Sequence, residues 1–291
     1  MSENGPIFVI SDLHMGDGGS RDNFSRGRKG NREAELGKFL DYVCGERGEL
    51  VIIGDLFEFW QANLSTLVVK RRGLLDRFAE MRAVYVVGNH DVDLQAFIGT
   101  GFLCHPFLGQ MCRPFERTIN GKRFRFMHGH EVDPFNCGEL PSWGRMFSIF
   151  AGICEDAEES PFLPDGRPVE GLLDEFGELL LRLLNSSRSK VGKPTPIIAR
   201  PNPKQQLTPA QNAERVEELH RKYREHKEAH GYDVAIVGHT HRPGRLEDWY
   251  YNSGSWAGQS NNFLRISASG RVDVFDWTEE GPVANKTSLN E

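Results

Sequence analysis

The chain has 291 residues, of which 38% are hydrophobic and 26% charged, a composition typical of a soluble globular protein. Its formal net charge of −6 does not favour a nucleic-acid-binding protein, although it is compatible with a local basic patch. The length suits one large domain, or one domain with a sizeable insertion. No apolar run approaches the roughly 20 residues that a membrane-spanning helix needs, so we expect no membrane span.

The cysteines and the N-terminus indicate a cytoplasmic protein. Five cysteines are scattered along the chain without a CxxC pair, which is typical of reduced thiols in the cytosol. The N-terminus, MSENGPIFVISDLH, has neither the basic region nor the long apolar run of a signal peptide. A cytoplasmic protein of this kind could still lie on the surface of the inner membrane.

The first third of the chain alternates between short apolar runs and segments with helical spacing. Strands are predicted at residues 7–11, 50–54 and 83–88, and helices at residues 32–47 and 64–81. This alternation is typical of βαβ units with parallel strands. A loop rich in glycine and arginine, residues 16–31, follows the first strand.

The pattern changes after the third strand. Asn120-Gly121 joins two strand-like runs, residues 113–119 and 122–127, and is a strong signal for a hairpin turn. Residues 139–231 are interpreted as a helical, lid-like insertion, with helices expected at residues 143–154, 169–184 and 209–230. Strands are then expected at residues 233–237, 245–252, 262–267 and 271–277. We therefore predict an α/β core of two sheets within residues 1–278, and a polar, frayed tail at residues 279–291.

Five short segments rich in aspartate, asparagine and histidine stand at the ends of predicted strands. They are Asp12-Leu13-His14, Gly54-Asp55, Gly88-Asn89-His90-Asp91, His128-Gly129-His130 and Gly238-His239-Thr240-His241. Functional groups converge at strand ends in open α/β sheets. Residues i and i+2 of an extended strand face the same side, so Asp12 with His14, and His239 with His241, are expected to chelate as pairs. One histidine alone is more often a surface or core residue, but five such segments favour a shared site.

The donor atoms in these segments are carboxylate oxygen, amide oxygen and imidazole nitrogen, without thiolate. This set suits Mn, Fe, Zn or Mg in a site with open coordination positions. A carboxylate such as Asp55 can bridge two ions, and two ions about 3.5–4 Å apart stabilise both the attacking and the leaving oxygen of a phosphoryl displacement. The donor set leaves the metal open among these four. We expect two divalent ions, with manganese as the first choice and iron, zinc or magnesium as alternatives.

The order of the five segments resembles the motif series of the calcineurin-like metallophosphoesterase family, which is DxH, GDxxD, GNH(D/E), HGH and GHTH. The resemblance covers residues 1–130 and 231–270. It implies a four-layer α/β/β/α sandwich around a dinuclear site, with a metal-bridging hydroxide as the nucleophile. A non-catalytic scaffold with this fold should have lost ligands, whereas this chain keeps every ligand type.

The same resemblance implies a role for each site residue. One ion would be bound by Asp12, His14, Asp55 and His241, and the other by Asp55, Asn89, His128 and His239. His90 would contact the phosphate and stabilise or protonate the leaving group. Glu58 stands where the second motif of the family ends in aspartate, and it would orient His90 with a longer reach.

Two longer stretches look like those of UDP-2,3-diacylglucosamine hydrolases: GDLFEFW at residues 54–60 and GHTHRP at residues 238–243. Those enzymes of lipid A synthesis cleave the pyrophosphate of a lipid-linked nucleotide sugar, and they carry a helical lid between these two motifs. They often have arginine at the position of His90 and aspartate at that of His130. The alternative is another phosphodiester or phosphomonoester, such as a cyclic nucleotide, a phosphoprotein or nucleic acid.

Basic and apolar stretches outside the motifs leave the mode of substrate binding open. Arg21, Arg26, Arg28, Lys29 and Arg32 follow the first strand and could hold a second phosphate or form a solvated loop. Residues 182–204 carry six basic side chains that could contact an anionic head group or belong to a linker. Apolar stripes at residues 143–153 and 172–183 suit either a lipid-binding lid or the core of a helical subdomain. We expect a small-molecule or lipid-linked phosphate substrate, no nucleic acid, and peripheral membrane contact through the insertion.

Overall fold

A computed structural model describes residues 5–19, 22–25, 31–59, 62, 64–101, 103–133 and 209–289, with side chains from residue 217 onward in the last range. The chain forms two compact units, Met1–Arg145 with Glu218–Glu291, and Met146–Glu217. The helices expected at residues 143–154 and 169–184, and the basic stretch at residues 182–204, lie outside the described residues. Within the described part of the chain, no helix is both long and apolar enough to cross a bilayer.

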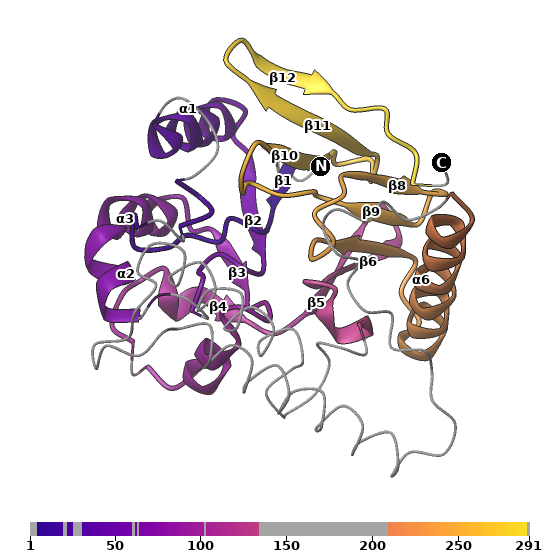
Figure 1. Cartoon of the computed structure of the whole chain (residues 1–291), viewed down its shortest axis with the longest axis horizontal. Coiled ribbons are helices and arrows are strands. Elements are labelled where there is room, and N and C mark those ends of the chain that lie inside the picture. The colour runs from indigo at the N-terminus through magenta and orange to yellow at the C-terminus, as the bar shows by residue number, and fades with distance from the viewer. Residues whose placement is uncertain are drawn as a thin grey trace, which may run out of the picture. The chain divides into compact units, whose positions relative to one another are not determined.

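Two β-sheets form the centre of the fold (Figure 1). The seven-stranded sheet has the order β12-β11-β10-β1-β2-β3-β4, and the five-stranded sheet has the order β5-β6-β7-β9-β8. The strands of the first are β1 Ile7–Ile10, β2 Glu49–Ile53, β3 Val84–Val86, β4 Met111–Cys112, β10 Asn262–Ile266, β11 Val272–Thr278 and β12 Gly281–Ala284. Those of the second are β5 Phe115–Ile119, β6 Lys122–Phe126, β7 Val234–Val237, β8 Gly244–Leu246 and β9 Tyr250–Asn252. Strands β1 to β3 run parallel, as do β6 and β7, so their carboxyl ends lie at one edge of each sheet.

Strand alternation places apolar side chains on both faces of each sheet. In β1, Ile7 and Val9 pack against Phe126 and Ile236 of the second sheet and fill the space between the sheets. Phe8 and Ile10 point the other way. The two sheets therefore lie face to face over one apolar core.

Helices cover the outer faces (Figure 1). They are α1 Arg32–Gly45, α2 Leu64–Lys70, α3 Arg72–Glu80 and α6 Pro209–His230, with short 3₁₀ helices at Val92–Phe97, Leu108–Gln110 and His130–Val132. Apolar residues of α1 and α3, such as Phe39 and Phe78, pack on the first sheet, and Tyr223 of α6 packs on the second. The four layers confirm the α/β/β/α sandwich that the sequence predicted, and α6 has the bounds expected for the third helix of the insertion.

The helix expected at residues 64–81 is instead two helices, which meet at Arg71. The guanidinium group of Arg71 is buried and donates to the Gly16 carbonyl oxygen at 3.0 and 3.1 Å. It also pairs with the buried carboxylate of Asp22. Arg71, at the break between the two helices, thus holds the loop that follows β1. Helical spacing in the sequence does not reveal such a contact.

Two strand predictions were wrong in detail. The strand expected at residues 245–252 is a pair of antiparallel strands, β8 and β9, because Glu247 turns the chain at a φ of 52°. The run expected at residues 113–119 starts at Phe115, while β4 just before it belongs to the first sheet.

The tail was expected to be frayed, and this is wrong for most of it. Residues Gly281–Ala284 pair with β11 as strand β12, at the edge of the first sheet. The chain then reaches the second sheet, where the Leu289 amide donates to the Arg245 carbonyl oxygen at 3.0 Å. An edge strand exposed along one side needs no apolar alternation, so the sequence carried no strand signal here.

Candidate dinuclear metal site

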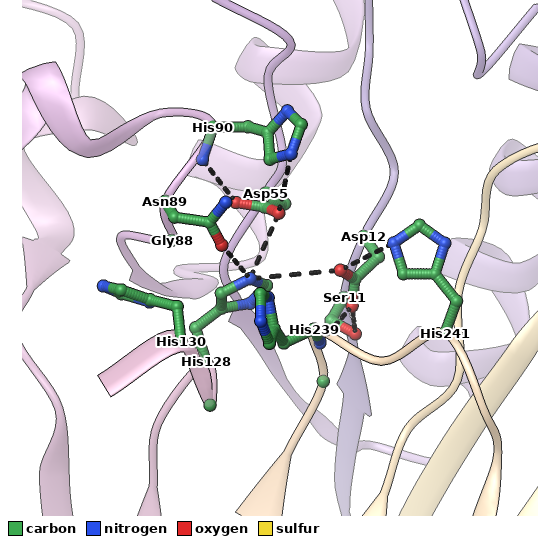
Figure 2. A network of polar contacts seen from close by, with 12 residues as sticks. Ser11, Asp12, Asp55, Gly88, Asn89, His90, His128, His130, His239 and His241 are labelled. Atoms are coloured by element: carbon green, nitrogen blue, oxygen red, sulfur yellow. Dashed lines mark hydrogen bonds and ion pairs between the residues drawn. The ribbon is translucent and has the colours of Figure 1, made fainter. Parts of the chain in front are cut away.

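All five motif segments meet at the carboxyl ends of parallel strands (Figure 2). Three follow β1, β2 and β3 of the first sheet, and two follow β6 and β7 of the second. The contacts between them cross from one sheet to the other: His128 Nε2 lies 3.1 Å from Asp55 Oδ2, and His241 Nε2 lies 3.1 Å from Asp12 Oδ1. The site therefore spans both sheets.

The backbone at this site is strained. Among the described residues, nine non-glycine residues have positive φ angles, and five of them belong to the motif segments. These five are Asp12 at 53°, His14 at 48°, Asp55 at 50°, His239 at 68° and His241 at 57°. A left-handed conformation costs an L-residue about 1–2 kcal/mol, and such residues cluster at functional sites. Sharp turns just after the strands therefore aim these side chains, rather than the alternation of an extended strand.

Two glycines of the motifs permit close approach of the segments. A Cβ atom at Gly54, which has a φ of +91°, would overlap the ring of His128. A Cβ atom at Gly238 would overlap Ser11 and the carboxylate of Asp12. The glycines that precede Asp55 and His239 are therefore required by packing at the site.

The potential ligand atoms fall into groups that lie within 4.8 Å of one another. One group is Asp12, His14 and His241, a second is Asp55, His128 and His239, and a third is His14, Asp55 and His90. Asn89 Oδ1 adds to the second group, 3.1 Å from His128 Nε2. All seven predicted ligands thus converge. The expectation that His239 and His241 chelate as one pair was wrong, because the two rings belong to different groups.

Hydrogen bonding of His128 indicates that a cation belongs at the second group. Its Nδ1 lies 2.8 Å from the Ile53 carbonyl oxygen, which can only accept, so Nδ1 carries the proton. In a neutral ring, Nε2 then offers a lone pair, and it faces two further acceptors, Asp55 Oδ2 and Asn89 Oδ1, each at 3.1 Å. Three acceptors that face one another need a proton or a metal ion between them.

Asp12 gives the same indication for the first group. Its carboxylate is fully buried, and Oδ2 accepts hydrogen bonds from the Ser11 hydroxyl and, at 2.9 Å, from the His239 amide. Oδ1 has no hydrogen bond and faces His241 Nε2 and His14 Nε2 at 3.1 and 3.8 Å. A buried carboxylate oxygen without a hydrogen bond is costly, and a divalent cation at this position would remove the cost.

The pKa shifts of two histidines also indicate that the site favours a cation. Burial alone would lower the pKa of His128, but the charge of Asp55 raises that pKa to about 10. Burial likewise opposes a proton on His14, yet contact with Asp12 and Glu58 raises the pKa of His14 well above its ordinary value. The negative charge that favours a proton on these rings also favours a divalent cation.

Glu58 holds two histidines. Its buried carboxylate lies 2.9 Å from His14 Nδ1 and 2.8 Å from His90 Nδ1. Burial opposes its ionisation, but hydrogen bonds from His14 and His90 lower the pKa of Glu58 to about 2. The His90 ring then points Nε2 toward the site, 3.9 Å from Asp55 Oδ2. Sequence reasoning expected the contact with His90 and missed the one with His14.

Asp91 is a further residue that sequence reasoning left without a role. One of its oxygens accepts from the Gly88 amide at 2.6 Å, and the other accepts from the Leu56 amide at 2.8 Å and from the Tyr85 hydroxyl. Burial and the charge of Asp55 raise the pKa of Asp91 to about 6. Asp91 thus ties the loop after β3 to the loop after β2, and its place in the third motif was the available signal.

Arg32 and His130 have positions that the sequence did not indicate. Arg32 is buried and donates to the carbonyl oxygens of Trp256 and Ser260 at 2.7 and 2.9 Å, so it supports the fold and is not part of a basic rim. The other four cations of that stretch lie outside the described residues. His130 is buried beside His128, with ring centroids 5.4 Å apart, and belongs to none of the three groups.

The fold and these convergent side chains define a metal-dependent hydrolase of phosphate esters. Residues 5–243 match the calcineurin-like phosphoesterases, and the chain belongs to this family. The family membership and the clusters of histidine and aspartate agree with a dinuclear site for divalent ions.

Comparison with curated proteins gave no match. Among solved structures, the chain is similar to wild-type Vps29 in complex with zinc from Entamoeba histolytica, at 13% identity and a TM-score of 0.43, covering 98% of this chain and 99% of that one. It is also similar to Vps29 from Cryptosporidium parvum, at 10% identity and a TM-score of 0.41, covering 97% of both chains. A predicted phosphoesterase from Streptococcus pneumoniae has 12% identity and a TM-score of 0.39, with coverage of 97% and 94%.

Proposed function

We propose that seven side chains bind the two divalent ions of this phosphoesterase. Asp12, His14, Asp55 and His241 bind one ion, and Asp55, Asn89, His128 and His239 bind the other. The observation that carries the proposal is the set of buried acceptor atoms that face one another, above all Asp12 Oδ1, which has no hydrogen bond. When bound, the ions would neutralise phosphoryl charge and supply a nucleophile at neutral pH.

His90 acts on the phosphate ester in this proposal, and Glu58 is its positioning residue. The His90 side chain is 16% exposed, and its Nδ1 is held by the Glu58 carboxylate. A proton can then sit on Nε2 only in the imidazolium form, which the negative charge of Glu58 favours and burial opposes, so that the pKa of His90 lies below its ordinary value. His90 Nε2 would donate to the phosphoryl group and deliver a proton to the leaving oxygen.

The substrate that we propose first is the pyrophosphate of a UDP-2,3-diacylglucosamine-type lipid, in lipid A synthesis. The stretches at residues 54–60 and 238–243 support it, and so does the long interval between the fourth and fifth motifs, which is rich in apolar helical patterns. Hydrolysis would release UMP and a lipid monophosphate. A substrate of this kind would bring the protein to a membrane surface.

One feature of the site favours a second candidate, a phosphodiester or phosphomonoester with an alcohol as its leaving group. The leaving group of a pyrophosphate is itself a phosphate, whose second pKa is about 6, so it needs no proton at neutral pH. An alkoxide leaving group does need one, and a proton-donating His90 held by Glu58 suits that need.

A substrate panel separates the two candidates. The purified protein, loaded with manganese or treated with a chelator, is given UDP-2,3-diacylglucosamine, a chromogenic phosphodiester and a chromogenic phosphomonoester. We expect metal-dependent release of UMP from the lipid, and loss of all hydrolysis in Asp55→Ala and His239→Ala. If the lipid stays intact while the phosphodiester is cleaved, the second candidate replaces the first. If Asp55→Ala and His239→Ala keep the hydrolytic activity of the wild-type protein, the assignment of the ligands is refuted.

A further inference from the structure

Asp133 contacts the metal site although it lies outside all five motifs. It follows the 3₁₀ helix His130–Val132, and its amide donates to the His130 carbonyl oxygen at 3.1 Å. This tight turn after Gly129 brings the Asp133 carboxylate back toward the second sheet. Its Oδ2 lies 2.9 Å from His239 Nε2, and the two side chains are 26% and 14% exposed.

The contact decides which nitrogen of His239 is available to an ion. An ionised carboxylate only accepts hydrogen bonds, so Nε2 of His239 carries the proton. In the neutral ring, Nδ1 then keeps its lone pair. The main chain is fixed as well, because the His239 amide donates to Asp12 Oδ2 at 2.9 Å. His239 is thus held on both sides with one ring nitrogen free.

Two other histidines of the site are held in the same manner through the opposite nitrogen. Glu58 holds His14 at Nδ1, and the Ile53 carbonyl oxygen holds His128 at Nδ1. In both rings Nε2 is the atom that faces the other acceptors. An acceptor behind each imidazole is the arrangement that orients metal ligands in proteins and raises their basicity.

A carboxylate 2.9 Å from a histidine could also be a ligand of the same ion. The convergent group argues against this, since it joins His239 with Asp55 and His128 and does not include Asp133, although the structure describes Asp133. We propose that Asp133 is a positioning residue: it holds His239 by Nε2, so that Nδ1 faces the ion of the second group. This inference rests on the proposed ligand set.

The test measures metal binding rather than activity. Manganese is titrated calorimetrically into the metal-free full-length protein, its Asp133→Asn and Asp133→Ala variants, and His239→Ala. Asp248→Asn is the matched control, since that side chain is 90% exposed and lies 3.6 Å from Arg245 Nη1, on the second sheet. The melting temperature of each metal-free protein is recorded beside the titration.

We expect the wild-type protein and the control to bind two ions. Both Asp133 variants should still bind two, with the affinity of one ion lowered about 10- to 100-fold and the melting temperature of the metal-free protein unchanged. Asp133→Glu should restore part of that affinity. His239→Ala should bind one ion.

Two results would overturn the inference. Wild-type affinity for both ions in Asp133→Ala would show that the contact has no effect on His239. A drop to one ion in Asp133→Ala, as in His239→Ala, would make Asp133 a ligand. Failure of the wild-type protein to bind two ions would instead refute the proposed ligand set, so the two failures are distinguishable.

Discussion

Binding of divalent ions should expel protons from His14 and His128. The charges around them raise the pKa of both rings, that of His128 to about 10, and so favour a proton on each ring in the metal-free protein. Only a neutral imidazole binds a metal ion. Filling the site should therefore release about two protons per chain, and the apparent affinity should rise about 100-fold per pH unit near neutrality.

The assay is calorimetric titration with manganese in buffers of different ionisation enthalpy, because the slope of the observed heat against that enthalpy counts the protons released. His128→Gln should lower the count by about one. His226→Gln, a change outside the site, should leave it unaltered. An affinity independent of pH, with no protons released, would refute the reasoning, since it would mean that the carboxylates of the site do not hold these rings in the charged form.

Three further predictions concern single side chains. Glu58→Gln should lower kcat about 100-fold because it removes the charge behind His90, while Glu58→Asp keeps part of the rate; equal rates in all three proteins would contradict this role. Asp91→Ala leaves three backbone amides without their acceptor, so chemical denaturation should show a loss of about 2–4 kcal/mol in the free energy of unfolding. Burial and His230 lower the pKa of His226 to about 4, below its ordinary 6.5. The neutral side chain therefore contributes to the free energy of unfolding above pH 6.5, and this contribution is lost as the pH falls toward 4. After allowance for the partial exposure of His226, the free energy of unfolding of the wild-type protein should fall on the order of 1 kcal/mol more than that of His226→Gln over this pH range. Identical dependence of stability on pH in the two proteins would contradict the lowered pKa of His226.

The sequence was sufficient to predict that the motif side chains converge, because the motif residues directly follow buried parallel strands. Strands such as β1 and β7 are continuous apolar runs, so their ends can be placed from the sequence, and parallel pairing brings those ends together. What the sequence misjudged was the local geometry. Asp12 and His239 lie in left-handed turns beyond their strands, and that conformation depends on tertiary contacts with the neighbouring segments.

The parts that could not be predicted depend on contacts between distant residues. Arg71 divides α2 from α3 while it anchors Asp22, and nothing in the helical spacing marks this position. Asp133 reaches His239 from a separate segment, and a single aspartate in a polar stretch has no distinguishing pattern. Strand β12 is exposed along one side, so its residues do not alternate in polarity.

The last residues of the described chain have a consequence for self-association. Strand β8 ends the second sheet, and an open strand edge is a template on which another molecule can pair. Ser288 forms a parallel bridge with Arg245 of β8. The segment that follows β12 therefore covers part of the open edge of β8, which leaves less of that edge for pairing with another molecule.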